Sequence, residues 1–192
     1  KIRDSIDVKR LTKIPIISAL AKNYSGTSLL FDQNPKSLIF EGFRGLRTNL
    51  DFIELNQKNK TIMVTSSTSG EGKTYISENI AIAYAVSNKK TLVIGADLRR
   101  PRLYKDFNKH SKFGISNYLE NPKIKIEDII LKSDEKNLDL LYSGYKPERP
   151  AELFASDRFI ELITKLKLLY DVIIIDTPPV GLVADALIIS KS

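Results

Sequence analysis

The sequence predicts an α/β domain built on a mostly parallel, doubly wound sheet, and three observations support this fold class. Short apolar runs alternate along the chain with segments of helical periodicity, the order that a parallel sheet with helical crossovers requires. The runs at 61–65, 91–94 and 172–175 are continuous rather than alternating, as expected for strands buried on both faces. A loop rich in Ser and Gly joins the first run to a helix, an arrangement that suits a bound phosphate group.

The chain is expected to begin with an irregular arm. Residues 1–34 are punctuated by Pro15, Gly26 and the Asn34-Pro35 pair, so we place the arm at 1–34 and the domain at 35–192. The elements expected after the arm are a helix at 36–55, a strand at 61–65, a helix at 73–86, a strand at 91–94, helices and turns at 101–133, a strand at 138–142, a helix at 156–169, a strand at 172–175 and a helix from 183. Since a doubly wound sheet normally continues with another strand, we expect that the chain is truncated at its C-terminus.

Composition and charge narrow the classes of function. The length of 192 residues, 42% of them hydrophobic, suits one globular domain. The chain has no cysteine and one histidine, His110, which excludes a thiolate metal site and argues against a zinc site or a Ser-His-Asp triad. The net charge of +7 is compatible with nucleic acid, anionic lipid or phosphate ligands. No recognised DNA- or RNA-binding motif is present, so we expect no nucleic acid partner. The basic first 13 residues are either a solvated leader or a juxtamembrane segment.

The strongest motif is the loop after the first expected strand, Ser67-Thr68-Ser69-Gly70-Glu71-Gly72-Lys73-Thr74. It has the pattern of a P-loop in which a serine replaces the first glycine. Gly70 and Gly72 permit positive φ and a close approach of the backbone to phosphate. Lys73 is placed to reach the β- and γ-phosphate oxygens, and the Thr74 hydroxyl is a magnesium ligand. The residues expected to bind ATP or ADP are Ser69, Gly70, Glu71, Gly72, Lys73, Thr74 and Tyr75.

Two carboxylates follow expected strands. Asp176 ends the run at 172–175 and is followed by a Thr-Pro-Pro turn, so beside a P-loop it is interpreted as the Walker B carboxylate. Asp97 follows the run at 91–94, where the alternative is a strand-ending turn stabilised by Arg99. We predict that Thr74, Asp97 and Asp176 hold Mg²⁺. The catalytic residues are predicted to be Lys73, Asp97 and Asp176.

These motifs carry a family resemblance. The P-loop, a strand ending in Asp97-Leu98-Arg99, and the run Ile174-Ile175-Asp176-Thr177-Pro178-Pro179 resemble the Walker A, A′ and B elements of bacterial tyrosine kinases. The fold class implied is the deviant-Walker, ParA- and MinD-like class of P-loop NTPases. These kinases are cytoplasmic domains of inner (plasma) membrane proteins that control capsule and exopolysaccharide assembly. The resemblance implies an ATP-dependent protein-tyrosine autokinase that requires Mg²⁺. The implied partners are a membrane-spanning activator segment, on the same or another chain, and the tyrosine-rich tail of a neighbouring subunit.

The helix expected at 36–55 combines a core stripe with a charged row. The stripe is predicted to consist of Leu38, Ile39, Phe43, Leu46, Leu50 and Ile53. Glu41, Arg44 and Arg47 lie at i, i+3 and i+6, so they project from roughly one side of the helix. Spacing alone favours an intrahelical ion pair on a solvated face. The segment from Glu41 to Asn49 also resembles the family's Glu-x-x-Arg-x-x-Arg-Thr-Asn motif, which implies contacts between subunits of a ring-like homo-oligomer.

Two departures from the family pattern bear on catalysis. The first aspartate of the family's Asp-x-Asp-x-Arg motif is replaced by Gly95, which leaves the catalytic base unassigned. The eight tyrosines lie at 24, 75, 84, 104, 118, 142, 145 and 170 and form no cluster near the C-terminus. The acceptor tyrosines are therefore expected in a missing tail or on another protein.

Two other functions fit the same Walker elements. A ParA- or MinD-like ATPase switch would carry its signature lysine at position 68, where this chain has Thr68, and it would lack the Glu-x-x-Arg-x-x-Arg segment. A nucleotide-gated oligomerisation module would need neither a catalytic base nor a tyrosine tail. The kinase interpretation is preferred over both.

Overall fold

The computed structural model describes residues 5–24, 29, 36–53, 59–101, 107, 109 and 111–191. Its helices are α1 (Ser5–Leu11), α2 (Leu38–Ile53), α3 (Lys73–Val86), α4 (Ile115–Glu120), α5 (Pro150–Phe154), α6 (Asp157–Leu169), α7 (Asp185–Ile189) and a 3-10 helix, η2 (Ile126–Asp128). Its strands are β1 (Lys60–Val64), β2 (Thr91–Gly95), β3 (Ile130–Lys132), β4 (Leu138–Leu141) and β5 (Val172–Asp176). They form one sheet in the order β1-β5-β2-β4-β3.

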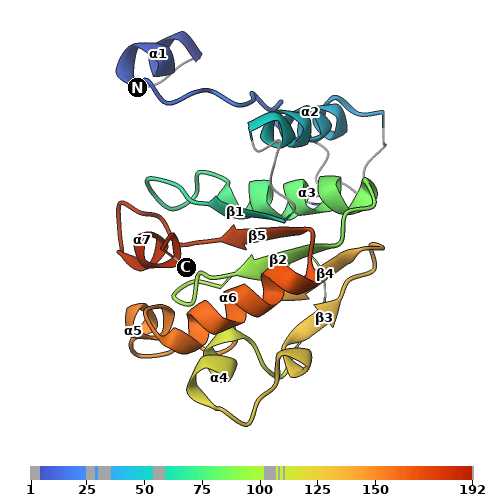
Figure 1. Ribbon diagram of the computed structural model, residues 1–192. Coiled ribbons are helices and arrows are strands. Elements are labelled where there is room, and N and C mark those ends of the chain that lie inside the picture. The colour runs from blue at the N-terminus through green and yellow to red at the C-terminus, as the bar shows by residue number, and fades with distance from the viewer. Residues whose placement is uncertain are drawn as a thin grey trace.

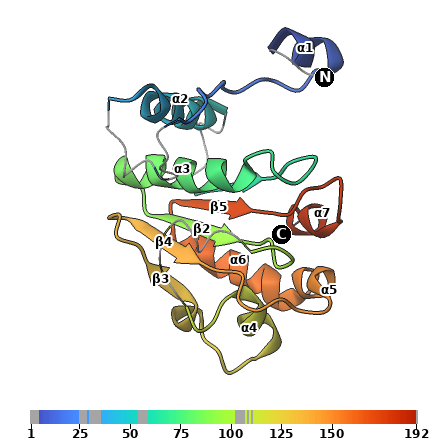
Figure 2. The same ribbon diagram turned by 180° about the vertical axis from the view of Figure 1, so that it is seen from behind.

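The sheet lies between two layers of helices. Figure 1 and the reverse view in Figure 2 show α3 on one face, with α2 outside it, and α4, α5 and α6 on the other face. The β1–β5, β5–β2 and β2–β4 pairs are parallel, and only the β3–β4 pair of the described strands is antiparallel. The prediction of a mostly parallel, doubly wound α/β sheet is confirmed.

The strands differ in burial because of their positions in the sheet. Every residue of β2 and β5 is buried, as their continuous apolar runs predict. The residues of β1 are only partly buried, so the expectation that this strand is buried on both faces was wrong. Within the described part of the chain, β1 is an edge strand that pairs with β5 alone.

The short strand β3 was not predicted, because segment 101–133 was expected to hold helices and turns. Three residues are too few to show a strand period. The strand forms because it pairs with β4, with Ile130 opposite Leu141 and Lys132 opposite Asp139. The Lys132 Nζ lies 2.7 Å from Asp139 Oδ2, so this pair also joins the two strands through side chains.

Helix α2 packs against α3 through its centre. Phe43 is fully buried, and its ring meets Tyr75 of α3 edge-on at a centroid distance of 5.7 Å. Phe40 is also buried, although the predicted stripe omitted it. Two predicted stripe residues are exposed, Leu38 at 82% and Ile53 at 61%, because both lie at the ends of the helix. The other three members of the stripe, Ile39, Leu46 and Leu50, are partly buried against the core.

The N-terminal arm is not wholly irregular, as the prediction had it, because residues 5–11 form α1. No residue of this helix is buried, and it stands apart from the other helices in Figures 1 and 2. The following residues run along α2, where the Asn49 side chain donates to the Ile17 carbonyl at 2.7 Å and Leu20 joins the core. None of the described helices has the length and apolar character needed to cross a bilayer.

Candidate functional site

The strand order brings the three predicted motifs to one edge of the sheet. Strand β5 lies between β1 and β2, with Val64, Asp176 and Gly95 in register across the three strands. The P-loop leaves β1, Asp176 is the last residue of β5, and Asp97 follows β2 by two residues. Ligands of open α/β sheets bind at the carboxyl ends of the strands, where these groups meet.

The loop has the backbone that phosphate binding requires. Gly70 and Gly72 have φ angles of 90° and 93°, a region that L side chains rarely adopt. Among the described residues, no atom beyond each glycine and its chain neighbours lies within 4 Å of where a Cβ would stand, so the space beside both glycines is open. The Glu71 side chain turns back and accepts from the Ser67 backbone N–H at 2.8 Å and the Thr68 N–H at 3.2 Å. A hydrogen bond from the Ser67 hydroxyl is the main reason that the pKa of Glu71 is lowered, and the two backbone bonds act in the same direction and hold the first half of the loop.

The first turn of α3 supplies a cation and a hydroxyl. The Lys73 Nζ lies 3.5 Å from Asp97 Oδ2, and the Thr74 hydroxyl donates to Asp176 Oδ2 at 2.7 Å. Burial raises the pKa of Asp176, whereas the charge of Lys73 and the hydrogen bond from Thr74 act in the opposite direction. Ser77, which the motifs did not indicate, donates its hydroxyl proton to the Lys73 carbonyl at 2.9 Å, and the same oxygen lies 3.4 Å from Asp176 Oδ1. Its position three residues after Thr74, on the same face of a helix, is the signal that could have identified it.

Asp97 closes a strand-ending turn with one carboxylate oxygen and faces the P-loop lysine with the other. Its Oδ1 accepts from the backbone N–H groups of Arg99 at 3.3 Å and Arg100 at 2.9 Å, which closes a turn at the end of β2. Its Oδ2 faces Lys73. The Arg99 side chain does not stabilise this turn directly, because it pairs with Asp185, which raises the pKa of Arg99.

The residues fit a magnesium–nucleotide complex. Thr74, Asp97 and Asp176 offer oxygen ligands beside an open loop of backbone N–H groups. No cluster of three His, Cys, Asp or Glu side chains able to hold a metal ion occurs among the described residues. Mg²⁺ typically binds through one or two carboxylates, water and substrate phosphates, so two carboxylates are sufficient here. The remaining predicted nucleotide contacts, Ser69 and Tyr75, lie in the loop and in the first turn of α3.

A second segment, the loop that follows β5, contacts the start of the P-loop. In the β5–α7 loop (residues 177–184), the Val180 N–H donates to the Ser66 carbonyl at 2.9 Å, and the Pro178 carbonyl accepts from the Thr65 hydroxyl at 3.0 Å. A Cβ on Gly181 would overlap the carbonyl oxygen of Ser67. No local sequence pattern indicates this role of the loop, because its partners are more than 100 residues away in the chain.

The charged row of α2 forms bonds within the single chain. The Arg44 Nη1 lies 2.8 Å from Glu41 Oε1, and its guanidinium also stacks on the Phe40 ring at 4.7 Å. The Arg47 Nη1 donates to the Ala83 carbonyl of α3 at 3.1 Å. The row lies on α2, away from the Walker motifs that meet at the carboxyl edge of the sheet.

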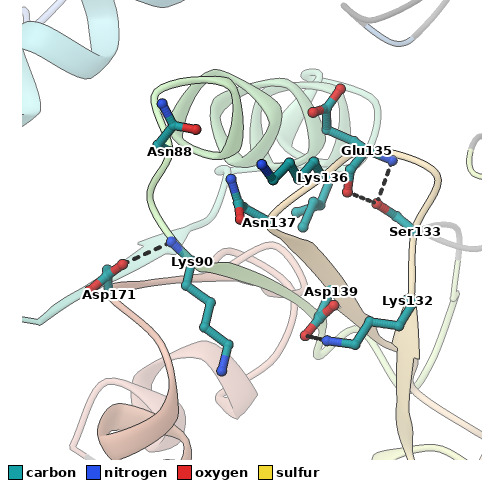
Figure 3. Close-up of a pocket in the computed structure, with 10 residues that line it drawn as sticks. Asn88, Lys90, Lys132, Ser133, Glu135, Lys136, Asn137, Asp139 and Asp171 are labelled. Carbon is teal, nitrogen blue, oxygen red and sulfur yellow. Dashed lines mark hydrogen bonds and ion pairs between the residues drawn. The ribbon is translucent and has the colours of Figure 1, made fainter.

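A separate hollow of about 330 Å³ lies at the other end of the sheet, where the parallel strands β2, β4 and β5 begin. Figure 3 shows Lys90, Lys132 and Lys136 around it, with the Lys132–Asp139 ion pair and a bond from the Lys90 backbone to Asp171. Acidic and basic side chains therefore both line this hollow. None of the predicted nucleotide-site residues lines this hollow.

The fold and the site together define a P-loop nucleotide-binding domain of the α/β class. A family model described as "AAA domain" matches residues 59–192. The chain is 38% identical over 173 residues to the putative tyrosine-protein kinase CapB of Staphylococcus aureus, and the match covers 90% of this chain and 75% of that protein. Among solved structures, the chimerical protein CapA2B2 matches with a TM-score of 0.90 at 37% identity, over 98% of this chain and 81% of that one. The chain belongs to the bacterial tyrosine-protein kinase family, as its resemblance predicted.

The ParA- and MinD-like proteins are more distant. MinD of Pyrococcus horikoshii, solved with Mg-ADP, matches with a TM-score of 0.60 at 25% identity, over 69% of this chain and 54% of that one. This match confirms the predicted fold class, and the kinase interpretation is the better supported one. The chain spans only 22% of a Klebsiella pneumoniae putative tyrosine-protein kinase in a cps region, to which it is 37% identical.

The contact between Gly181 and Ser67 yields a prediction. In the Gly181→Ala variant the new methyl group should displace the start of the P-loop, because overpacking against backbone costs about 1–3 kcal/mol. We expect ADP affinity, measured by isothermal titration, to fall about tenfold. Gly45→Ala is the control, because it lies within α2 and no described atom outside its chain neighbours and the helix backbone lies within 4 Å of its Cβ position. Equal ADP affinities for the two variants would contradict the supporting role of the β5–α7 loop.

Proposed function

We propose that this chain is the catalytic part of an ATP-dependent protein-tyrosine kinase that regulates capsular or exopolysaccharide polymerisation and export. The observation that carries the proposal is the meeting of Lys73 with Asp97, and of Thr74 with Asp176, beside the open P-loop. Membership of the tyrosine-kinase family supports the choice of reaction. The names of relatives from capsule regions support the choice of process.

Each residue of the site has a distinct proposed role. The backbone N–H groups of residues 69–75 bind the phosphates of ATP, and Lys73 orients the γ-phosphate and neutralises its charge. Thr74, Asp97 and Asp176 hold Mg²⁺, which when bound offsets negative charge on the phosphate oxygens. The acceptor hydroxyl attacks the γ-phosphorus, the bond to the β–γ bridging oxygen breaks and ADP leaves, while the hydroxyl proton passes to water or to a γ-phosphate oxygen. Such a reaction depends mainly on positioning and charge, which this scaffold supplies.

The acceptor tyrosine is proposed to come from the tyrosine-rich tail of a neighbouring subunit. The tyrosines within this domain are poorly suited to the role, because Tyr84, Tyr118, Tyr142 and Tyr170 are all buried. Among the described tyrosines, only Tyr24 and Tyr145 have exposed side chains. The Tyr145 hydroxyl donates to Glu120, and this bond is the main reason that its pKa rises to about 12.

Copies of this chain are proposed to form a ring at the cytoplasmic face of the plasma membrane. A membrane-spanning activator segment, on the same or another chain, would connect the ring to the membrane. The basic arm at 1–34 is then a juxtamembrane segment, and residues 35–192 form the kinase domain. Glu41 and Arg44 are about half exposed, at 55% and 45% of their side chains, so both remain accessible to a second copy. Arg47 would contribute once it exchanges its bond to α3 for one across the interface.

The kinase assignment predicts different effects for substitutions of Lys73, the first residue of α3, and of Lys89, which follows that helix. Lys73→Met should reduce phosphotransfer from labelled ATP to tyrosine by about 100-fold or more, since the variant loses an electrostatic partner of the γ-phosphate. Lys89→Met, in an exposed position after the helix, should behave as the wild type. Phosphotyrosine immunoblots beside a free-phosphate assay provide the measurement. Release of phosphate by the wild type without any phosphotyrosine would instead indicate an ATPase switch.

Gly95 yields a second prediction. It is in register with Asp176, and positive φ occurs among the described glycines only at 70, 72 and 144, so the backbone does not demand glycine here. In Gly95→Asp the new carboxylate would lie on the same side of the sheet as Asp176 and could accept the tyrosine proton. We expect faster single-turnover phosphotransfer with a smaller change in ATP affinity. A slower variant enzyme would refute the view that a base is missing.

The proposed ring predicts salt-sensitive association through α2. Exposed ion pairs contribute about 0.2–1 kcal/mol each, so their repetition around a ring is what makes them matter. Arg44→Ala should lower the mass measured by light scattering toward that of the monomer. The matched control is Arg149→Ala, which removes another exposed i,i+3 pair, with Glu152. If both variants keep the wild-type mass, the α2 row is not the interface.

A further inference from the structure

An ion pair outside the predicted site joins α7 to the turn that carries Asp97. Asp185, the first residue of α7, is only 1% exposed. Both of its oxygens are engaged by Arg99, with Nε to Oδ2 at 2.7 Å and Nη2 to Oδ1 at 3.0 Å. Such two-bond pairing of a guanidinium with a carboxylate sets direction as well as distance. The position of the Arg99 side chain is therefore defined by α7.

The backbone of the same arginine defines the orientation of Asp97. The Arg99 N–H donates to Asp97 Oδ1 at 3.3 Å, beside the donation from Arg100 at 2.9 Å. With Oδ1 engaged in this turn, Oδ2 is left to face the Lys73 ammonium at 3.5 Å. A rotation of the turn would redirect the carboxylate. The chain of contacts thus runs from Asp185 through Arg99 to Asp97.

The segment that ends at Asp185 also contacts the P-loop. It begins directly after Asp176, and its Val180 N–H bonds to the Ser66 carbonyl at 2.9 Å. One stretch of ten residues, 176 to 185, therefore contains one proposed metal ligand, supports the start of the P-loop and holds the turn of the other metal ligand. Figure 1 shows α7 at the same end of the strands as the loop between β1 and α3.

We infer that Asp185 is a positioning residue of the magnesium–nucleotide site, which acts through Arg99 to aim Asp97 at the metal. The inference rests on the proposed function, because it takes Asp97 as a magnesium ligand. A buried ion pair is weak evidence for stability, since desolvation offsets its attraction, but it can fix one geometry. Residues that orient metal ligands typically alter metal affinity about 10- to 100-fold when they are changed.

The experiment compares two buried carboxylates that each form an ion pair. Asp185→Asn removes the charge that holds Arg99, which is 39% exposed and can be solvated. Asp139→Asn is the control, because Asp139 is also buried and binds Lys132 Nζ and the Tyr170 hydroxyl, both at 2.7 Å, at the opposite edge of the sheet. Both variants should melt at lower temperature. Only Asp185→Asn should weaken ADP binding in the presence of Mg²⁺, by about 10- to 100-fold, with a much smaller change in EDTA.

A double variant tests whether Asp185 acts through Asp97. On an Asp97→Asn background, Asp185→Asn should change Mg-ADP affinity by less than about twofold, because the group that it positions is already lost. Independent, multiplicative losses in the double variant would overturn the inference. So would an Asp185→Asn protein with lowered melting temperature and unchanged Mg-ADP affinity, since that result describes a purely structural ion pair.

Two further measurements keep the outcomes distinct. If Asp185→Asn does not fold, Arg99→Lys retains the positive charge but loses the two-bond geometry, and it should show the same magnesium-dependent loss. Unchanged Mg-ADP affinity in that variant would reject the inference. The single variant Asp97→Asn tests the proposed function itself. If it binds Mg-ADP as the wild type does, the metal site is wrong, whereas a loss in Asp97→Asn without one in Asp185→Asn rejects only the role of Asp185.

Discussion

The placement of β5 between β1 and β2 is the constraint on which the rest of the site depends. Because the three strands are parallel and in register, their carboxyl ends present the P-loop, Asp176 and Asp97 side by side. Asp176 is nearly fully buried there, yet it accepts a hydrogen bond from Thr74, lies 3.4 Å from the Ser77 hydroxyl and is near the charge of Lys73. A buried carboxylate is tolerated when such partners surround it, so the strand order and the polar contacts support each other.

The site is held from two directions. Helix α3 brings its first turn to the sheet, and α2 covers α3 through Phe43 and Arg47. From the other side, the β5–α7 loop contacts the start of the P-loop, and Asp185 binds Arg99. A phosphotransfer site that works by positioning needs such support on rigid elements, because a small displacement of one ligand costs much of the rate.

The Walker motifs and the charged row of α2 occupy separate parts of the domain. The Walker motifs lie at the carboxyl edge of the sheet, whereas the charged row of α2 lies on the outer helix, where Figure 1 shows no strand beside it. In the single chain, Arg44 pairs with Glu41, and Arg47 bonds to α3. The proposed association would therefore have to exchange existing bonds for new ones.

By itself, the sequence determined the fold class, the P-loop and the two strand-end carboxylates, since apolar period and loop composition are local properties. It also contained the motifs that place the chain in its family. Tertiary structure alone decided which residues join distant segments. The pairing of β3 with β4, the contact of Gly181 with Ser67 and the Arg99–Asp185 pair link residues that only the folded chain brings together. No local pattern encodes such partners, because each depends on where the strand order places the other segment.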